Sequence, residues 1–376
     1  PALMLITAIE PIILRLDQVD TTRADGTQDA FVVRVHTDDG LVGIGEADTS
    51  PYVARTIVEM PSSHAVARGL GELLIGQDPA RIGALWDRMY RGSYHYGRAG
   101  AALHAMSAID IALWDIAGQV AGVPVSALLG GRRAEAIPVY ASEVMPESPD
   151  EVRAIARRAV AAGYRALKLG WGPLGASLER DVELVAAARD ELGPERALMI
   201  DGGMAYSVKR AIQLVRELEP FGIHWLEEPL QADDYDGYRR LSDAVAVRIA
   251  AGEADSGLRA YRALVELGHV DVLQPDLARC GGFTVGRQIA ELAAATGTEV
   301  VPHCFSTGIL VAASLHFTAA IAGATYSEFS VADSPLVNGL LTEPFALDGA
   351  GRVAVPAGPG LGIRLNDELV ERLRHR

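Results

Sequence analysis

The sequence is poor in cysteine and in positive charge. Its 376 residues include only Cys280 and Cys304, which form neither a disulfide framework nor a metal-type cysteine spacing. This usage is typical of a reducing compartment, so we expect a cytoplasmic protein. Lysine and arginine number 34 against 49 aspartates and glutamates, which gives a formal net charge of −15. This balance argues against nucleic acid or an anionic membrane as a partner.

Long apolar runs are also missing. No stretch approaches the ~18 residues that a membrane span needs, and the opening PALMLITAIEP lacks the basic and apolar regions of a signal peptide. We therefore expect neither a membrane anchor nor a leader. The hydrophobic fraction of 49% is ordinary for a globular protein. The chain length fits two domains if one of them is a barrel of about 250 residues.

Residues 1–130 have the pattern of a small α+β domain, in which strands precede helices. A long helix is predicted over 98–121 from apolar residues at helical spacing, and Gly122 and Pro124 should end it. The tight turn of a hairpin is expected at Asp38-Asp39-Gly40. The predicted strands are 3–16, 29–37 and 40–47.

From residue 131 to 345 the pattern changes to a regular alternation of short strands and helices. Eight such strands over ~200 residues predict a parallel barrel rather than an open sheet. The predicted strands are 137–142, 165–169, 197–201, 223–227, 247–251, 271–274, 298–302 and 324–328. The predicted helices include 150–162, 177–191, 207–218, 257–267, 281–295 and 309–320. The Gly- and Pro-rich stretch 346–376 is expected to return to the first domain.

Ionisable residues stand at the ends of seven of the eight predicted barrel strands. Barrel enzymes carry their chemistry at these carboxyl ends, whereas a barrel core is apolar, so the pattern indicates an active site. The residues are Lys168, Asp201, Glu227, Glu253, Asp276, His303 and Glu328.

Three of these strand ends are carboxylates on consecutive strands: Asp201, Glu227 and Glu253. Carboxylates that converge on one point repel one another unless a cation lies between them. Oxygen ligands favour Mg²⁺ or Mn²⁺ over zinc. A single such acid is also explained as a helix N-cap or first-turn residue. Three in a row favour a metal site.

The other strand-end residues predict acid–base chemistry. Strand alternation turns Leu167 and Leu169 toward the helices and Lys168 into the barrel mouth, although a lysine at the rim is an alternative. Asp276 can fix one nitrogen of His303 and leave the other as a base. Glu328 is either a hydrogen-bond donor with a raised pKa or a salt-bridge partner of Lys168.

A weaker candidate is an anion site at Cys280-Gly281-Gly282, which opens a predicted helix. Glycines needed for close packing explain the same residues, and we prefer that interpretation.

With these residues in view, the chain resembles the enolase superfamily, and within it the mandelate racemase-like group that includes the acid-sugar dehydratases. AIDIALWDIAGQVAGVPVSALLGG is similar to the family's passage from capping domain to barrel. IHWLEEPL, AGEAD, QPDLARCGGF and VVPHCFSTG resemble its strand-end motifs, and GPGLGI its C-terminal return. The resemblance implies an N-terminal α+β capping domain on a modified TIM (β/α)7β barrel.

The resemblance also implies roles for the strand-end residues. Asp201, Glu227 and Glu253 would be the Mg²⁺ ligands, Asp276 and His303 the acid–base dyad, and Glu328 a support for the substrate carboxylate. The chain departs from the family at two places. The family's Lys-x-Lys is Lys168-Leu169-Gly170 here, and its Asp-x-Asn is Asp201-Gly202-Gly203.

Gly170 decides between reactions, because a racemase needs a base on each face of its substrate. A one-base mechanism is favoured, in which His303 takes the α-proton of a 2-hydroxy acid while metal and Lys168 hold the enediolate. His303 then protonates the departing 3-hydroxyl, which yields a 2-keto-3-deoxy acid. Lactone cycloisomerisation needs the same residues; racemisation or epimerisation is a further alternative. An inactive barrel kept as a binding protein is the non-enzymatic alternative.

The substrate is expected to be a small carboxylate, an acid sugar or its lactone. Specificity should lie in capping loops near Val19–Gln28 and Asp48–Met60, which close over the barrel mouth. Arg23 and Tyr52 are candidate substrate contacts, although both are explained equally well as solvated loop residues. The family resemblance implies a homo-oligomer, often an octamer.

Overall fold

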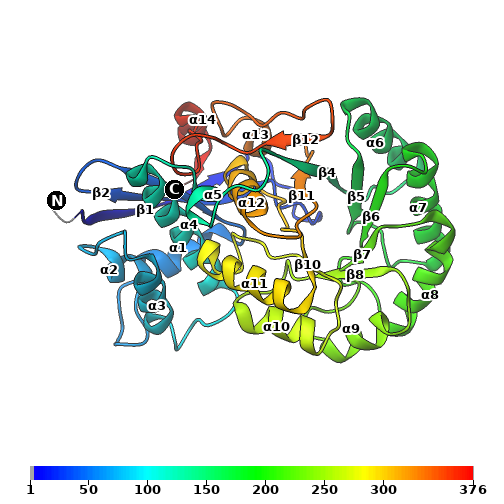
Figure 1. Ribbon diagram of the computed structural model, residues 1–376, viewed down its shortest axis with the longest axis horizontal. Helices are drawn as coiled ribbons and strands as arrows, with labels where there is room; N and C mark the ends of the chain where they lie inside the picture. The colour runs from blue at the N-terminus through cyan, green and yellow to red at the C-terminus, as the bar shows by residue number, and fades with distance from the viewer. Residues whose placement is uncertain (1–3, 376) are drawn as a thin grey trace.

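The chain forms two parts that lie side by side, a smaller N-terminal domain and a barrel (Figure 1). The computed structural model describes residues 4–375. The first residue of the predicted strand 3–16 and the last of the predicted return 346–376 therefore lie outside the described residues, as do residues 1–3 of the predicted first domain.

The N-terminal domain is built on an antiparallel sheet of β1 (Ile6–Arg15), β2 (Asp29–Thr37) and β3 (Val42–Ala47), with the short β13 (Arg374–His375) beside β1. The predicted hairpin joins β2 to β3 through Gly40 at φ 89°. Phe31, Val33 and Val35 of β2 face the domain's own core, whereas the alternate residues Ala30 and Val32 face the barrel. A strand that is buried on both faces fixes the sheet against the barrel.

Helices cover this sheet: α1 (Pro51–Glu59), α2 (Leu70–Leu74), α3 (Ile82–Gly92), α4 (Ala101–Ala121) and α5 (Val125–Leu128). The predicted long helix is α4, which ends at Gly122 in the left-handed conformation. The expectation of a loop over Asp48–Met60 was wrong, because most of it is helix α1. Pro51 starts this helix, and Ala54, Ile57 and Val58 bury its inner face.

The barrel consists of seven strand–helix units and a final strand, as predicted. The parallel strands follow one another round the sheet in the order β10-β9-β8-β7-β6-β5-β4-β11. The strands are β4 (Ala136–Val144), β5 (Ala166–Gly170), β6 (Ala197–Asp201), β7 (Trp225–Glu227), β8 (Arg248–Ala251), β9 (Val272–Leu273), β10 (Glu299–Val300) and β11 (Ser327–Ser330). The helices are α6 (Pro149–Ala162), α7 (Leu178–Leu192), α8 (Val208–Leu218), α9 (Tyr235–Ser242), α10 (Leu258–Glu266), α11 (Gly282–Thr296) and α12 (Gly308–Ala320).

Among the described residues, the barrel's ladder is interrupted between its last two strands. Within residues 4–375 no ladder pairs β10 with β11, which pairs with β4 instead. After β11 the chain forms α13 (Pro335–Asn338), β12 (Arg352–Ala354) and α14 (Asp367–Leu373). β12 pairs antiparallel with β4, and β13 joins the first domain's sheet, so the C-terminal segment touches both domains.

Two layers of side chains form the barrel core. Tyr140, Met199 and Trp225 belong to a cluster inside the barrel, whereas Leu167 and Leu169 pack outward against the helices as predicted. The same alternation that turns the leucines outward turns the intervening residue, Lys168, inward.

The N-terminal domain docks on the barrel through the starts of two barrel helices, α11 and α12. Asp110 of α4 accepts hydrogen bonds from the backbone N–H of Thr284 (3.0 Å) and from its hydroxyl, at the start of α11. A Cβ at Gly282 would lie 2.3 Å from the Asp110 carboxylate. Close packing therefore explains Gly282, and Asp110 occupies the position in which an anion would bind.

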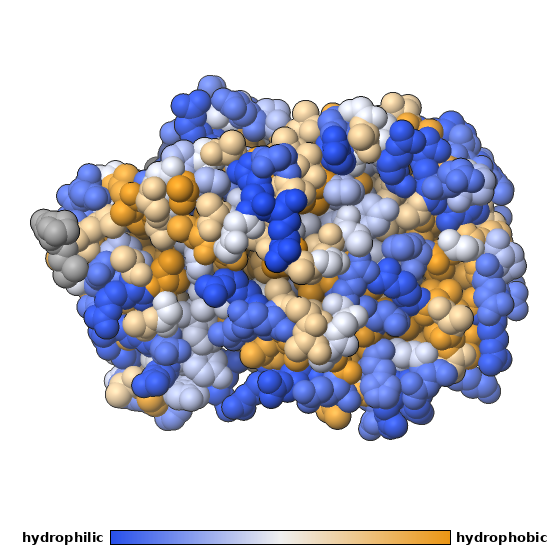
Figure 2. All heavy atoms as spheres, viewed as in Figure 1, coloured by the Kyte–Doolittle hydropathy of each residue, from blue (hydrophilic) through white to orange (hydrophobic). Residues whose placement is uncertain are grey.

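The surface seen in Figure 2 is mostly hydrophilic, with apolar side chains between the charged ones. In the part of the chain that the structure describes, no helix is long and apolar enough to cross a membrane.

Candidate active site

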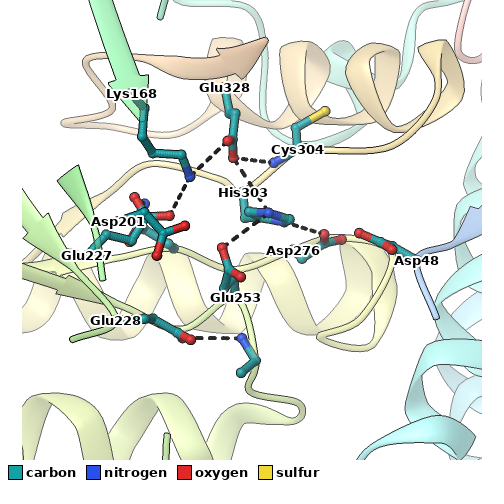
Figure 3. Close-up of polar contacts among 12 residues, drawn as sticks. Asp48, Lys168, Asp201, Glu227, Glu228, Glu253, Asp276, His303, Cys304 and Glu328 are labelled. Carbon is teal, nitrogen blue, oxygen red and sulfur yellow. Dashed lines mark hydrogen bonds and ion pairs between the residues drawn. The ribbon is translucent and has the colours of Figure 1, made fainter. Parts of the chain in front are cut away.

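Three carboxylates converge at the mouth of the barrel (Figure 3). Asp201 and Glu227 are the last residues of β6 and β7, and Glu253 follows β8 by two residues. One oxygen from each lies within 4.8 Å of the others, and all three side chains are buried. Neighbouring parallel strands end at the same edge, which brings the three acids together.

The electrostatics of these acids fit a cation. Burial raises the pKa of Asp201 well above its usual range, and repulsion from Glu227 and Glu253 raises it further. Burial likewise raises the pKa of Glu253 to about 7. Glu253 Oε2 is buried and has no hydrogen-bond partner among the described residues. Buried carboxylates in this arrangement form the kind of oxygen site that hard divalent cations prefer.

Lys168 lies between the carboxylate group and the last strand. Its ammonium donates to Glu227 Oε1 and lies 2.8 Å from Glu328 Oε1. Burial alone would lower the pKa of Lys168, but the charges of Glu227 and Glu328 raise it well above its usual range. The rim alternative for this lysine is wrong, because its side chain is 4% exposed.

His303 and Asp276 form a buried pair. His303 Nδ1 lies 2.7 Å from Asp276 Oδ2, and Asp276 Oδ1 accepts from the N–H of Ala278 at 2.6 Å. A carboxylate beside Nδ1 holds the ring proton there and leaves Nε2 toward the cavity. Nε2 lies 3.2 Å from Glu253 Oε2, without the geometry of a hydrogen bond.

The surroundings of His303 act on its basicity. Burial lowers the pKa of His303, but the charges of Glu253 and Glu328 and the hydrogen bond with Asp276 raise it to about 10. The largest of the raising effects comes from Glu253, which is also one of the three converging carboxylates.

Glu328 is a salt-bridge partner and not a donor. Although burial raises the pKa of Glu328, the charges of Lys168 and His303 lower it to about 2. Its Oε2 accepts from the N–H of Cys304 at 2.8 Å. The predicted raised pKa is therefore wrong for this arrangement, because the nearest charges are cations.

Glu228 supports the end of β8 and was missed by the sequence analysis. It adopts φ 31° and turns its carboxylate away from that of Glu227. Its Oε1 accepts from the N–H groups of Gly252 (3.1 Å) and Ala254 (3.3 Å), on either side of Glu253. The second acid of the Glu-Glu-Pro motif thus holds the backbone that positions Glu253.

A cavity of about 300 Å³ opens over this group of residues. Of the predicted residues, Lys168, Asp201, Glu253, His303 and Glu328 line it, whereas Glu227 and Asp276 lie behind them. The other lining residues are Ala24, Asp25, Gly26, Ser142, Glu143, Val144, Gly170, Trp171, Arg279 and Phe305. The first three come from the predicted capping loop 19–28, so this loop does reach the barrel mouth.

The structure places neither Arg23 nor Tyr52 in the cavity. Arg23 is exposed beside the lining residue Ala24. Tyr52 is 39% exposed and its hydroxyl lies 3.0 Å from His375 Nδ1, in a separate hollow with Asp48. Their predicted contact with substrate therefore has no support. The loop of Arg23 turns Asp25 and Gly26 inward instead, and Tyr52 belongs to helix α1, outside the cavity.

Gly170 leaves no room for a side chain. A Cβ there would lie 2.3 Å from the Cβ and 2.8 Å from the Cγ of Asp201. Space also explains why glycine stands at Gly203, where the family's Asp-x-Asn has an asparagine. A Cβ at Gly203 would lie 3.0 Å from the ring of Trp171. Both positions that are polar in the family are closed here by neighbouring side chains.

Arg279 links the N-terminal domain to the dyad. Its Nη2 lies 2.7 Å from Asp48 Oδ2, and its Nε is 3.9 Å from Asp276 Oδ2. Asp48, Asp276 and His303 form a second group of mutually close ligand atoms. The Arg279 guanidinium already supplies the cation that this group needs, so we assign no metal to it.

The sequence carried signals for two of the missed cavity residues. Glu143 follows the predicted strand 137–142 by one residue, at the only strand end to which the sequence analysis assigned no ionisable residue. Arg279 stands three residues after Asp276. Asp25 had no such signal, because only the docking of the N-terminal domain brings its loop over the barrel.

Comparisons with known proteins agree with this architecture. The family model described as "Mandelate racemase / muconate lactonizing enzyme, N-terminal domain" matches residues 12–130, and "Enolase C-terminal domain-like" matches residues 151–369. A D-galactarolactone cycloisomerase of Agrobacterium fabrum is 35% identical over 357 residues, covering 91% of this chain and 90% of that protein.

Other relatives have different activities. A D-gluconate dehydratase of Thermoproteus tenax is 34% identical over 382 residues, covering 98% of this chain and 74% of that protein. The crystal structure of a racemase from Streptomyces coelicolor A3(2) with bound magnesium superposes with a TM-score of 0.87 at 31% identity, covering 99% and 100% of the two chains. The chain therefore belongs to the mandelate racemase and muconate lactonizing enzyme family of the enolase superfamily.

Proposed function

We propose that the protein is a Mg²⁺-dependent dehydratase that converts an acid sugar to a 2-keto-3-deoxy acid. The observation that carries this proposal is the one-sided placement of the base. His303, held by Asp276, faces the cavity beside the three carboxylates, whereas Gly170 offers no base and no room for one. A single base favours elimination over the two-sided proton exchange of a racemase.

Asp201, Glu227 and Glu253 would hold the metal, because their oxygens converge and Glu253 Oε2 lacks a hydrogen-bond partner among the described residues. Bound there, Mg²⁺ would offset the carboxylate charge around His303 and stabilise the negative charge that develops on the substrate carboxylate. Mn²⁺ is an alternative ion for the same ligands.

Side chains of this protein carry out the proton transfers and bind the enediolate. His303 Nε2 takes the α-proton while Asp276 keeps the ring oriented through Nδ1. Lys168 donates hydrogen bonds to the oxygens of the resulting enediolate, and its ion pairs with Glu227 and Glu328 hold it in place. Protonated His303 then gives the proton to the departing 3-hydroxyl, so water leaves and the enol tautomerises to the 2-keto acid.

Lactone cycloisomerisation is a second candidate, which the A. fabrum cycloisomerase favours because it is 35% identical over nearly the whole chain. The first step would be the same, but a ring oxygen would leave in place of water. The product would then keep the mass of the substrate, whereas dehydration makes it lighter by one water.

A screen of mono- and diacid sugars and their lactones with Mg²⁺, read by mass spectrometry and by 2-keto acid formation, tests the proposal. We expect a product lighter by one water, loss of activity with EDTA and recovery with Mg²⁺. Activity in metal-stripped protein would contradict the metal site. In D₂O, deuterium entering both C2 epimers would demonstrate a second base and a racemase. Metal-dependent stabilisation without turnover of any compound would indicate an inactive binding protein.

A further inference from the structure

Besides Glu328, which pairs with Lys168, two acidic side chains line the cavity without belonging to the converging carboxylates. Asp25 lies on the loop from the N-terminal domain, and Glu143 lies near the end of β4. Neither forms an ion pair with any residue from 4 to 375, although both are half-buried. Half-buried carboxylates without a cation are costly, so their presence in the wall of a ligand cavity needs an explanation.

The loop holds Asp25 in place. Asp25 Oδ1 accepts from the N–H (3.0 Å) and the hydroxyl (2.7 Å) of Thr27. Thr27 is buried, and its carbonyl accepts from Ser334 Oγ of the barrel at 2.7 Å. A Cβ at Gly26 would lie 3.2 Å from the carbonyl oxygen of Phe305. These contacts anchor the loop to the barrel and fix the Asp25 carboxylate in the cavity wall.

Glu143 experiences the charge of Asp25. Burial raises the pKa of Glu143, and repulsion from Asp25 adds to this effect, whereas Arg23 and Arg158 lower the pKa. Both arginines are exposed, and neither lines the cavity. The two acids therefore form a negative region of the wall whose balancing cations stand outside it.

The cavity's cations are engaged elsewhere. Among the described residues that line the cavity, the lysine and arginine side chains are Lys168 and Arg279. Lys168 pairs with Glu227 and Glu328, and Arg279 pairs with Asp48. The third cationic side chain of the wall, His303, lies between Asp276 and Glu253. A second carboxylate on the substrate would thus find carboxylates and no free cation in the cavity wall.

On this basis, and resting on the proposed function, we infer that the enzyme selects substrates with a single carboxylate. Asp25 and Glu143 accept hydrogen bonds from hydroxyl groups on the neutral part of an acid sugar, or of its lactone or anhydro form. The same two carboxylates repel the second carboxylate of a diacid. The preference for monoacids over diacids thus has two sources at Asp25 and Glu143: repulsion of a second carboxylate and hydrogen bonding to substrate hydroxyl groups.

The test compares an aldonate with the aldarate that has the same configuration at every shared stereocentre, for example D-gluconate with D-glucarate. We expect wild-type kcat/KM for the monoacid to exceed that for the diacid by at least ~10-fold, since like charges brought together cost several kcal/mol. Asp25→Asn combined with Glu143→Gln should reduce this ratio by at least ~10-fold, mainly by raising diacid turnover. High salt should also reduce it in the wild type.

Glu147→Gln is the matched control, because Glu147 is a 77% exposed acid outside the cavity and its loss should leave the ratio unchanged. A wild-type preference for the diacid that disappears in Arg23→Gln would overturn the inference, since Arg23 would then supply the second cation. An unchanged ratio in the double variant would overturn it as well.

Binding measurements separate this inference from the proposed function. If neither acid is turned over, calorimetry of the Mg²⁺-loaded protein with the same pair decides the matter. Tighter binding of the monoacid, lost in the double variant, supports the selectivity while the proposed reaction fails. If the enzyme dehydrates diacids faster than monoacids, the proposed reaction holds and the inferred selectivity fails. If neither acid binds, the proposed reaction and the selectivity are both overturned.

Discussion

At the scale of single residues, the site depends on the absence of a side chain at Gly170 as much as on the charged residues around it. Gly170 stands where the family often places a second lysine, and the structure shows that the space is filled by Asp201. The missing base is therefore tied to the position of an acid in the converging group. A lysine could not be restored at this position without moving Asp201.

Gly170→Ala tests this coupling. Its Cβ would approach the Asp201 side chain and also its carbonyl oxygen at 2.9 Å, so both must shift. We expect Mg²⁺ affinity, measured by calorimetry, to fall by roughly 10- to 100-fold, the scale for disturbing the support of a metal ligand. Gly83→Ala is the control, because a Cβ there meets nothing within 4 Å. Unchanged Mg²⁺ affinity in Gly170→Ala would show that Asp201 is not a ligand or is free to move.

His303→Asn tests the proposed base. The variant keeps a polar side chain but cannot take up a proton, so we expect kcat to fall by at least ~10²-fold. His269→Asn is the control, because His269 is half-exposed and lies beside Asp243, away from the cavity. Turnover comparable to the wild type in His303→Asn would remove His303 from the mechanism.

At the scale of elements, the barrel strands could be predicted because their residues alternate between the helices and the interior. Most observed barrel strands lie within two residues of the predicted ranges, but β11 begins three residues later than predicted and ends two residues later. Helix α9 was given no range in advance, because its sequence, YDGYRRLS, is short and largely polar. The acids of the site could be found in the same way, since each lies in or just after a buried strand.

The part of the cavity wall that the N-terminal domain contributes could not be predicted with the same success. Its wall combines strand ends with a loop more than a hundred residues away, and a local pattern does not say which loop residue turns inward. Arg23 was the candidate contact from this loop, whereas the hydrogen bonds that Asp25 accepts from Thr27 decide which residue turns inward.

The contact between Asp48 and Arg279 connects the loop after β3 with the loop after β9. Arg279 also donates to the carbonyl of Glu253 at 3.2 Å, so it touches the backbone of an acid in the converging group. Arg279→Met should cost roughly 3 kcal/mol in unfolding free energy, because it leaves Asp48 nearly buried without its partner.

A double-mutant cycle with Asp48→Asn isolates this pair, and we expect a coupling energy of ~1–3 kcal/mol. Arg279→Lys should recover part of the loss, since it keeps the charge. The exposed pair Arg153 and Asp150 serves as a reference cycle, with a coupling below ~1 kcal/mol. Additive effects of Arg279→Met and Asp48→Asn would mean that the two loops are not coupled through this pair.

At the scale of the whole molecule, the N-terminal domain packs on the face of the barrel that carries the candidate active site. The helices that follow barrel strands begin at that face, and buried carboxylates of the first domain cap two of them, Asp110 at α11 and Glu46 at α12. The docking that brings Asp25 over the cavity therefore uses the backbone N–H groups at the ends of barrel helices. Assembly into an oligomer stays a prediction from the family.

Glu46 gives this docking a pH dependence. It is fully buried and accepts from Thr307 Oγ1 (2.7 Å), from the N–H groups of Thr307 (3.2 Å) and Leu310 (3.0 Å), and from Ser306 Oγ. Burial raises its pKa from an ordinary 4.5 to about 7, although these donors lower it. Between pH 4.5 and 7 the unfolded chain therefore releases a proton that the native state keeps. Stability from this group is full below pH 4.5 and falls as the pH rises to 7.

Glu46→Gln removes this titration and keeps one of the two acceptor oxygens for these donors, so any loss of hydrogen bonds is an offset that does not depend on pH. The rise in pKa corresponds to about 3 kcal/mol, so the unfolding free energy of the wild type should fall relative to the variant by up to that amount between pH 4.5 and 8. Thermal or urea unfolding of both proteins across this range measures the difference, and Asp110, present in both, cancels. Glu135→Gln, at an 85% exposed acid, should track the wild type at every pH. If the curves of Glu46→Gln and the wild type run parallel instead, Glu46 is ionised in the native protein across the whole range. In that case the hydrogen bonds from α12 outweigh its burial.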